Sequence, residues 1–249
     1  MRGHVAEDGT PSNVVSAHSG IGTAVTVDYD VTVDSYTVNV NQGGVVASDT
    51  FGPTDFDDMQ STPQLGVYTK TEVAEARALL LAQPGVGGTG LSYVTFGTWQ
   101  HLQGATAIES EMALFVAGVR TPLAGMPTGG MASYDGAVLG FWTDVTSVNT
   151  LGGTANIVAN FDAGSMSSHF VLTGTDLIDF SPKPFDSLNG TATISGTSFS
   201  GSLSGVSTPY SGTWAGGFFG PAGQEVGGSF RVADGFGGQA VGVFTGGSP

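Results

Sequence analysis

Few side chains in this sequence are of the types and spacings that carry out chemistry. Its 249 residues include four histidines and no cysteine. The absence of cysteine excludes thiol catalysis, cysteine-bound zinc, iron–sulfur clusters and disulfide bonds. The sequence also lacks the Gly-x-Ser-x-Gly elbow of serine hydrolases and the His-Glu-x-x-His pair of zinc proteases. We therefore expect a protein that is not an enzyme.

His101 has the surroundings best suited to ligand binding. It lies two residues after Trp99, where a predicted strand ends and a loop begins. A neutral imidazole in such a place can act as an axial ligand of haem iron, with an aromatic neighbour covering the porphyrin. Met126, in the loop 121–128, is a soft alternative ligand, and Arg120 is a candidate partner for the haem propionates. The alternative interpretation of His101 is an exposed histidine without a ligand.

Three other motifs have ordinary structural explanations. Residues 85–90 satisfy the pattern GxGxxG, but a strand pattern follows where a dinucleotide site needs a helix, so we predict a hairpin loop. Asp55, Asp57 and Asp58 offer oxygen ligands for Ca²⁺ without the order of an EF-hand, which favours a solvated acidic loop. Asn189-Gly190 begins a glycosylation sequon and is also a favoured turn pair, and we predict a hairpin turn there.

The composition limits the partners of the protein. Six Lys and Arg face 21 Asp and Glu, so the formal net charge is -15. Such an acidic chain is a poor candidate for binding nucleic acid or anionic membranes and suits cationic partners. No apolar run is long enough for a membrane-spanning helix, and Met1 is not followed by a signal peptide. If the protein is exported, we expect a mature or trimmed chain that has lost any lipid-anchoring cysteine.

The first third of the chain divides into two parts. Residues 1–20 are polar and lack periodicity, so we predict a flexible tail in which His4 and His18 bind nothing. Residues 21–88 form a small β-rich region crowded with aspartates. Within it, residues 71–83 have a helical propensity, with Thr71 as a cap and a run of alanine and leucine. A strand from about Ala76 is the alternative, and the family resemblance described below favours it.

From Leu91 onwards the pattern is one of short strands and turns. Ala155, Ile157, Ala159 and Phe161 alternate with polar residues, and His169 is expected to be exposed opposite Phe170. Trp214 and its alternate neighbours share one face of a hairpin whose turn is at residues 220–223. Glycines facing large rings are typical of a small closed barrel. With 41 glycines in the chain, we predict an all-β fold with an eight-stranded antiparallel barrel.

The segment GFFGPAGQEVGGSF, residues 217–230, resembles the signature near the end of the barrel in transferrin-binding-protein-B-like surface proteins. Residues 93–99 resemble the first barrel strand of that family, residues 126–136 the loop and strand after the second, and residues 241–246 the closing strand. The resemblance implies a barrel domain over residues 89–249. Factor H-binding protein and the hemophilin-type haem carriers have similar barrels.

This resemblance implies a surface-exposed or secreted ligand-binding protein, similar to outer-membrane lipoproteins, in a setting of iron or haem acquisition. Recognition is then expected at the barrel loops and the N-terminal region, with a protein or haem as ligand. A structural or adhesive surface protein that binds no small molecule is the alternative.

Two further barrel types have less support in the sequence. The sequence Gly97-Thr-Trp99 is similar to a lipocalin motif, but nothing after Val241 forms the lipocalin helix. A membrane-embedded barrel is disfavoured because the strands between Ala155 and Leu203 each pair one apolar face with one polar face.

Overall fold

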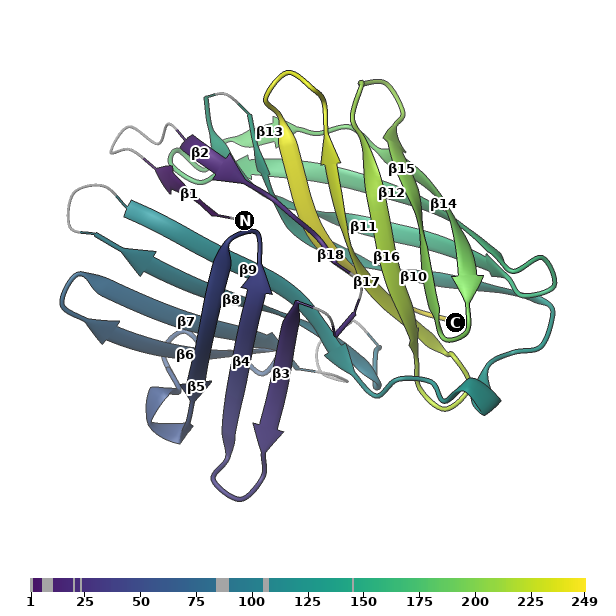
Figure 1. Ribbon diagram of the computed structural model, residues 1–249, viewed down its shortest axis with the longest axis horizontal. Helices are drawn as coiled ribbons and strands as arrows, with labels where there is room; N and C mark the ends of the chain where they lie inside the picture. Colours follow the sequence, from purple (N-terminus) through teal and green to yellow (C-terminus); the bar gives the residue numbers. More distant parts are fainter. Residues whose placement is uncertain are drawn as a thin grey trace.

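The computed structural model describes residues 2–5, 11–19, 21–22, 24–83, 90–104, 108–144 and 146–249. Its described residues form strands in three antiparallel sheets and two 3-10 turns, η1 (Pro53–Asp55) and η2 (Leu123–Gly125), without an α-helix (Figure 1). A helix capable of crossing a membrane is accordingly not found among the described residues. The glycine-rich segment 85–90, predicted to be a hairpin loop, lies almost wholly outside them.

The largest sheet closes into an antiparallel barrel of eight strands, which confirms the predicted fold class. The pairing of β11 with β12 joins the first strand of the sheet to the far side and closes it. Each barrel strand then has a paired neighbour on both sides. The short strand β13 (Pro182–Pro184) adds to the edge of β12. The barrel strands are β10 (Met131–Thr143), β11 (Val148–Asn160), β12 (Ser165–Asp176), β14 (Leu188–Ser195), β15 (Ser198–Gly205), β16 (Ser211–Phe219), β17 (Glu225–Ala233) and β18 (Gln239–Gly247).

Aromatic rings fill the barrel interior. Every second residue of β12 is buried while its neighbours are exposed, and His169 is exposed as predicted. Trp214 has no exposed surface, and its ring lies 5.1 Å from that of Phe199 and 5.6 Å from that of Phe244, measured between centroids. A Cβ on Gly216 would lie 2.5 Å from the ring of Phe199, so only glycine fits opposite that ring. The predicted interior face of the 214–230 hairpin is confirmed.

The hairpin turn expected at Asn189-Gly190 is wrong. Both residues lie inside β14, where Gly190 pairs with Leu203. A Cβ on Gly190 would come 3.1 Å from the indole nitrogen of Trp214 and 2.8 Å from Leu203. Glycine is therefore needed here to make room for a ring, and the turn follows instead at Gly196, whose φ of 59° is in the left-handed region.

Residues 93–99 are not the first barrel strand, so that expectation is wrong. They lie in β8 (Val94–Gln103) or directly before it, and β8 pairs with β7 (Glu75–Ala82) and β9 (Ile108–Gly118). Together with β6 (Leu65–Glu72), β1 (Arg2–Val5) and β2 (Pro11–Val15), these strands form a separate six-stranded sheet. The closed barrel begins only at β10. Residues 71–83 are strand rather than helix, since β6 and β7 form a hairpin that turns at Val73 and Ala74.

Two described parts of the segment expected to be a flexible tail, residues 2–5 and 11–15, are strands instead. Strand β1 pairs with the edge of β9 and with β2, which satisfies backbone groups that an open edge would leave unpaired. The residues after β2 lie against the barrel wall. His18 is half-buried there, with its Nε2 at 2.5 Å from the Thr213 hydroxyl, and Ser229 donates a hydrogen bond to the carbonyl of Ser19.

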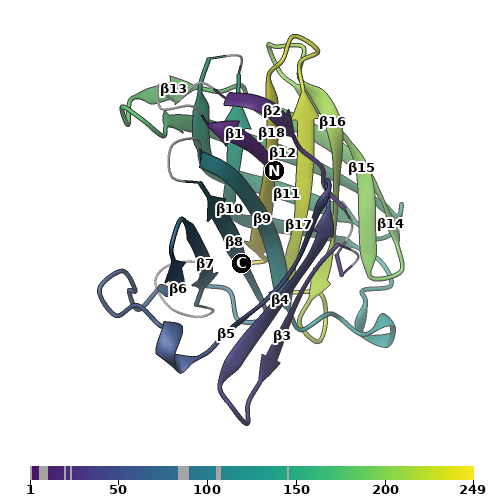
Figure 2. The same cartoon turned by 60° about the vertical axis from the view of Figure 1, so that its left-hand side comes forward.

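A third sheet of three strands packs on one face of the six-stranded sheet. It consists of β3 (Val25–Asp30), β4 (Ser35–Gln42) and β5 (Val45–Phe51). Val38 and Phe51 from this sheet meet Leu79, Trp99 and Phe115 from the other in one apolar cluster. The β3–β4 hairpin extends beyond that cluster and projects away from the barrel (Figures 1 and 2).

The six-stranded sheet is fixed to the outer wall of the barrel by β8 and β9. Leu91, Val94 and Phe219 form a small core between them. The carboxylate of Glu225, on the outer face of β17, is only 5% exposed. It accepts hydrogen bonds from the backbone N–H groups of Ser92, Tyr93 and Val94 at 2.6, 2.8 and 2.8 Å. This buried carboxylate thus joins the N-terminal sheets to the barrel.

Candidate functional site

Trp99 and His101, two of the residues predicted to bind a ligand, lie together on β8. Their ring centroids are 5.9 Å apart. Trp99 is fully buried, and its indole Nε1 donates a hydrogen bond of 2.7 Å to Asp49 on β5. The side chain of His101 is 11% exposed. Both residues therefore face the interface between the six-stranded and three-stranded sheets.

Each ring nitrogen of His101 lies within hydrogen-bonding distance of a carboxylate. Nε2 lies 2.6 Å from the Oε1 atom of Glu75, and Nδ1 lies 3.4 Å from the Oε2 atom of Glu111. The hydrogen bond to His101, followed by the charge of Arg77, lowers the pKa of Glu75, so this carboxylate is ionised and accepts the bond. An iron atom would have to displace one of the two carboxylates. The surroundings of His101 therefore do not fit the role of an axial haem ligand.

Arg120 and Met126, the other predicted ligand-binding residues, lie on the barrel instead. The Arg120 guanidinium donates to the carbonyl oxygen of Thr197 at 2.8 Å and lies over the ring of Phe219 at 5.5 Å. Met126 follows η2 and packs against the barrel core. The structure therefore does not bring the four predicted residues into one site.

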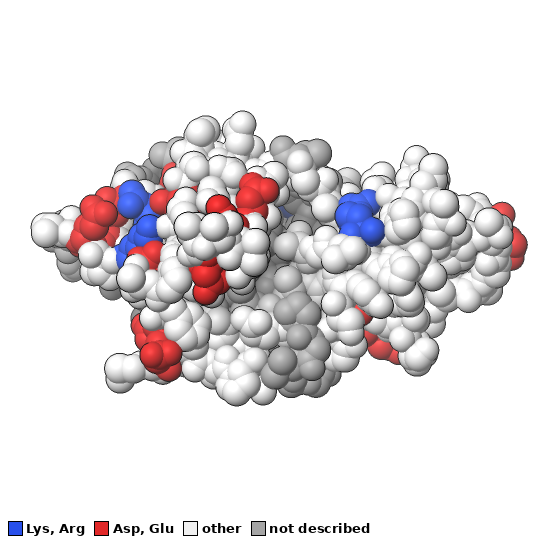
Figure 3. All heavy atoms as spheres, turned by 90° about the horizontal axis from the view of Figure 1, so that it is seen from below, with Lys and Arg blue, Asp and Glu red and all other residues white. Residues whose placement is uncertain are grey.

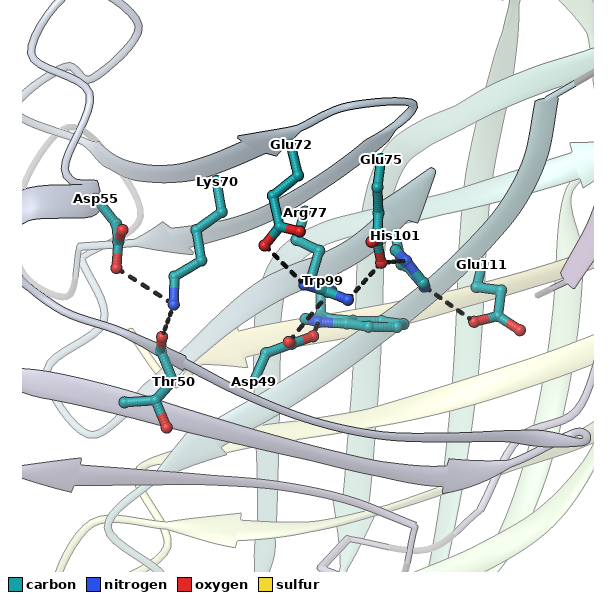
Figure 4. Close-up of polar contacts among 10 residues, drawn as sticks. All are labelled: Asp49, Thr50, Asp55, Lys70, Glu72, Glu75, Arg77, Trp99, His101 and Glu111. Carbon is teal, nitrogen blue, oxygen red and sulfur yellow. Dashed lines mark hydrogen bonds and ion pairs between the residues drawn. The ribbon is translucent and has the colours of Figure 1, made fainter. Parts of the chain in front are cut away.

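A chain of charged side chains runs along the interface around His101 (Figure 4). Arg77 pairs with Asp49 at 3.4 Å, with Glu72 at 3.9 Å and with Glu75. Lys70 pairs with Asp55 at 3.6 Å and donates to the carbonyl oxygen of Thr50. Lys70 and Arg77 are the only lysine or arginine residues between positions 21 and 88. Both are therefore already engaged by acidic side chains of this region.

The cavity beside this interface is small. It is lined by residues of the segment 17–22, the three-stranded sheet, β9 and the barrel wall, and its volume is about 80 Å³. That space accommodates roughly half a dozen water molecules. A porphyrin does not fit into it.

Four aromatic side chains form a continuous row across the N-terminal sheets, which we call the aromatic row. Tyr29 on β3 lies 4.8 Å from Tyr36 on β4, measured between ring centroids, and Tyr36 lies 5.6 Å from Tyr68 on β6. Phe56, after η1, extends the row at 5.3 Å from Tyr68. The rings at its two ends remain accessible, since Tyr29 is 51% and Phe56 is 41% exposed.

The tip of the β3–β4 hairpin, residues 30–34, continues this surface. Val31 is 80% and Val33 is 59% exposed. Asp34, which has a positive φ of 49°, accepts a hydrogen bond of 2.7 Å from the hydroxyl of Tyr29. Burial, with contributions from Tyr36 and Asp34, raises the pKa of Tyr68 to about 12. The tyrosines of the row are therefore neutral hydrogen-bond donors beside negatively charged aspartates.

Acidic side chains are concentrated on the N-terminal half of this face. Figure 3 looks from below, the side towards which the hairpin points, and most red side chains gather over the N-terminal sheets. The barrel half of the same face is largely uncharged. The hairpin tip and the aromatic row thus combine exposed apolar groups with an acidic border.

The sequence of the barrel matches a family model described as the C-lobe and N-lobe beta barrels of Tf-binding protein B, over residues 126–247. The barrel of this chain is thus similar to the barrels of transferrin-binding protein B. The match spans every barrel strand from β10 to β18 and includes the segment 217–230 on which the resemblance was first based. No curated protein matches the chain.

Solved structures of transferrin-binding protein B share the fold. The intact Ap-TbpB, with N and C lobes, has a TM-score of 0.55 and 16% identity, over 86% of this chain and 51% of that chain. A double mutant of the vaccine antigen transferrin-binding protein B from Haemophilus parasuis Hp5 has a TM-score of 0.56 and 20% identity, over 89% of this chain and 44% of that chain. The present chain therefore spans about half the length of these relatives.

The interior of this barrel is filled by its own side chains. The rings of Phe170, Trp214 and Phe230 occupy its interior and are fully buried. Sequence reasoning missed the aromatic row because its members come from three strands and the segment after η1. The one signal available was the hairpin itself, in which Tyr29 and Tyr36 are cross-strand partners.

Proposed function

We propose that this chain is a non-enzymatic ligand-binding protein of the bacterial cell surface, and that it binds a protein partner through the hairpin tip and the aromatic row. The observation that carries this proposal is the exposure of Val31, Val33 and Tyr29 on a hairpin that projects from the molecule. Exposed apolar groups of this kind on a soluble domain mark sites of interaction. The surface location rests on the family of the barrel and on the resemblance of its sequence to surface proteins.

The chemistry of this surface suits a protein with a cationic patch. Asp28, Asp30 and Asp34 border the exposed valines. Lys70 and Arg77, the lysine and arginine between positions 21 and 88, are paired with other acids. Tyrosine rings at the centre of an interface contribute strongly to affinity and also receive Lys and Arg side chains through cation–π contacts. Transferrin, the ligand in the names of the similar structures, is the first partner to test. An adhesive protein without a specific ligand is the less favoured alternative.

Serine substitutions at the hairpin tip test this proposal. We expect transferrin to bind the wild-type chain in a titration by surface plasmon resonance, more weakly as salt increases. Tyr29→Ser and Val31→Ser are each expected to weaken binding about tenfold or more, because both remove apolar contacts from the centre of the interface. Val171→Ser, on the outer wall of the barrel where Val171 is 47% exposed, is the matched control. Equal affinities of all three variants would exclude the hairpin tip as the binding surface.

Haem is the second ligand to test. Because both ring nitrogens of His101 are engaged by Glu75 and Glu111, we expect the absorbance spectrum of added haem to be the same with wild type and with His101→Ala. His169→Ala serves as the control, since that ring is exposed on β12. A sharp Soret band that disappears only in His101→Ala would instead support a haem carrier and displace the protein-partner proposal.

A further inference from the structure

One end of the barrel carries a second set of exposed apolar side chains. The loops 177–187, 206–210 and 234–238 all connect strands at this end, on the upper side in Figure 1. Ile178 is 58%, Phe180 is 76%, Val206 is 53% and Phe236 is 80% exposed. We call these four residues the mouth rim. None of the interactions described above involves them.

The three loops are joined to one another. The carboxylate of Asp186 accepts hydrogen bonds from the N–H groups of Ser207 and Thr208 at 2.8 and 2.9 Å. Val206 donates its N–H to the carbonyl oxygen of Ser187 at 3.0 Å. In the third loop, Gly238 lies so close to Tyr210 that a Cβ there would be 2.5 Å from the tyrosine hydroxyl. The mouth rim therefore stands on one connected surface.

Aromatic side chains close the barrel beneath this surface. The indole Nε1 of Trp142, on β10, donates a hydrogen bond of 2.9 Å to the hydroxyl of Tyr210, just before β16. The ring of Phe185 lies 5.2 Å from Trp142 and 4.9 Å from Tyr210. These three residues come from β10, from the loop before β14 and from the loop before β16, and they meet at this end of the barrel. A ligand at this end therefore binds on the rim and does not enter the barrel.

Aspartate side chains hold the backbone of two rim residues in place. Asp176 accepts from the N–H of Ile178 at 2.8 Å, and Asp234 accepts from the N–H of Phe236 at 2.7 Å. Phe180 has a φ of 57°, a left-handed conformation that costs energy for any residue with a side chain and that persists only where its surroundings impose it. A loop whose backbone is already held in place loses less conformational entropy on binding than a free loop.

The loops at this end of the barrel are acidic, which indicates the charge of a suitable partner. They contain Asp179, Asp186 and Asp234 but only one basic residue, Lys183, whose Nζ pairs with Asp176 at 3.5 Å. Hydrogen bonds from Ser181 lower the pKa of Asp179, so it is charged at neutral pH. Acidic groups beside exposed phenylalanines disfavour anionic lipid headgroups and favour a protein surface that carries lysine or arginine.

We propose that the mouth rim is a second docking surface, which takes an amphipathic protein segment with an apolar face bordered by Lys or Arg. This surface is distinct from the hairpin tip to which the proposed function assigns the first partner. It would let the barrel hold one protein while the N-terminal sheets hold another.

A peptide of the stated chemistry tests this proposal. The probe is an amphipathic helix of leucine and lysine, about 18 residues or five turns long, labelled for fluorescence anisotropy. We expect it to bind the wild-type chain, and a leucine–glutamate peptide of the same pattern not to bind. The double variant Phe180→Ser with Phe236→Ser is expected to bind the leucine–lysine peptide about 30-fold more weakly, the loss typical of two central apolar anchors. Val171→Ser, away from the rim, should bind like wild type.

Three outcomes would overturn the proposal. They are absence of peptide binding, equal binding by the double variant and wild type, and flotation of the wild-type chain with neutral phosphatidylcholine vesicles that the double variant abolishes. The last result would assign the rim to a lipid surface. Transferrin binding separates this proposal from the proposed function: Phe180→Ser with Phe236→Ser should retain it, and Tyr29→Ser should retain binding of the peptide.

Discussion

Replacing Trp214 with alanine is expected to lower the free energy of unfolding by about 3–5 kcal/mol, the range for large-to-small changes of buried aromatic residues. The indole has no exposed surface and contacts the rings of Phe170, Phe199 and Phe244. Its nitrogen also donates to the carbonyl oxygen of Thr191 at 3.1 Å, so the substitution leaves a buried acceptor without this donor as well as a cavity.

Urea denaturation followed by intrinsic fluorescence measures this effect. The control is Ser204→Ala, because Ser204 is exposed on the neighbouring strand β15 and the change removes no core contact. We expect this control to stay within about 0.5 kcal/mol of wild type. An unchanged midpoint and slope for Trp214→Ala would mean that the indole is not part of the barrel interior.

Replacing Glu225 with alanine is expected to destabilise the protein by about 3–5 kcal/mol. Three backbone N–H groups, those of Ser92, Tyr93 and Val94, would lose their acceptor in a buried place. Hydrogen bonds to a charged group contribute about 1.5–3 kcal/mol each, and their losses at one carboxylate are not additive. Glu225→Gln keeps the shape and one acceptor oxygen, so its effect should be smaller.

Amide hydrogen exchange locates this effect in the chain. We expect exchange at residues 92–94 to become faster in Glu225→Ala. Strand β12, which is paired with a barrel strand on each side, should keep its protection until the whole barrel opens. Glu72→Gln is the surface control: the Glu72 side chain is 67% exposed, and its ion pair with Arg77 at 3.9 Å should contribute at most about 1 kcal/mol. Unchanged exchange at residues 92–94 would contradict the role of Glu225 in joining the sheets.

The barrel could be predicted largely from local patterns. Alternating apolar residues in β11 and β12 and the glycines opposite Trp214 determine which face points inward, and both signals lie within short stretches of sequence. The sheet to which residues 93–99 belong could not be predicted in this way. Alternation predicts a strand but does not identify the strand it pairs with, and the small core of Val94 includes Phe219, more than a hundred positions further along the chain.

The candidate site was harder to predict than the fold. His101 was singled out for its neighbour Trp99, yet the carboxylates that engage it come from β7 and β9 on either side, at positions fixed by strand register. The exposed rings and valines of the hairpin tip carry no chemical motif, so only their accessibility in the folded protein marks them. The expected flexible tail became strand because β9 offers it an open edge, which the sequence of the tail itself does not reveal.

The packing of β8 and β9 against the outer wall of the barrel has a consequence for how the chain is made. The surface that receives these strands is formed by β17 and β18, which are synthesised after the N-terminal strands and after the other barrel strands. Until they appear, Val94 and the backbone groups of residues 92–94 have neither their apolar cover nor the carboxylate of Glu225. The N-terminal sheets therefore complete their packing only after β17 and β18 have been synthesised. A chain truncated before residue 225 is expected to leave these sheets without this cover, so its N-terminal region should be sensitive to proteases.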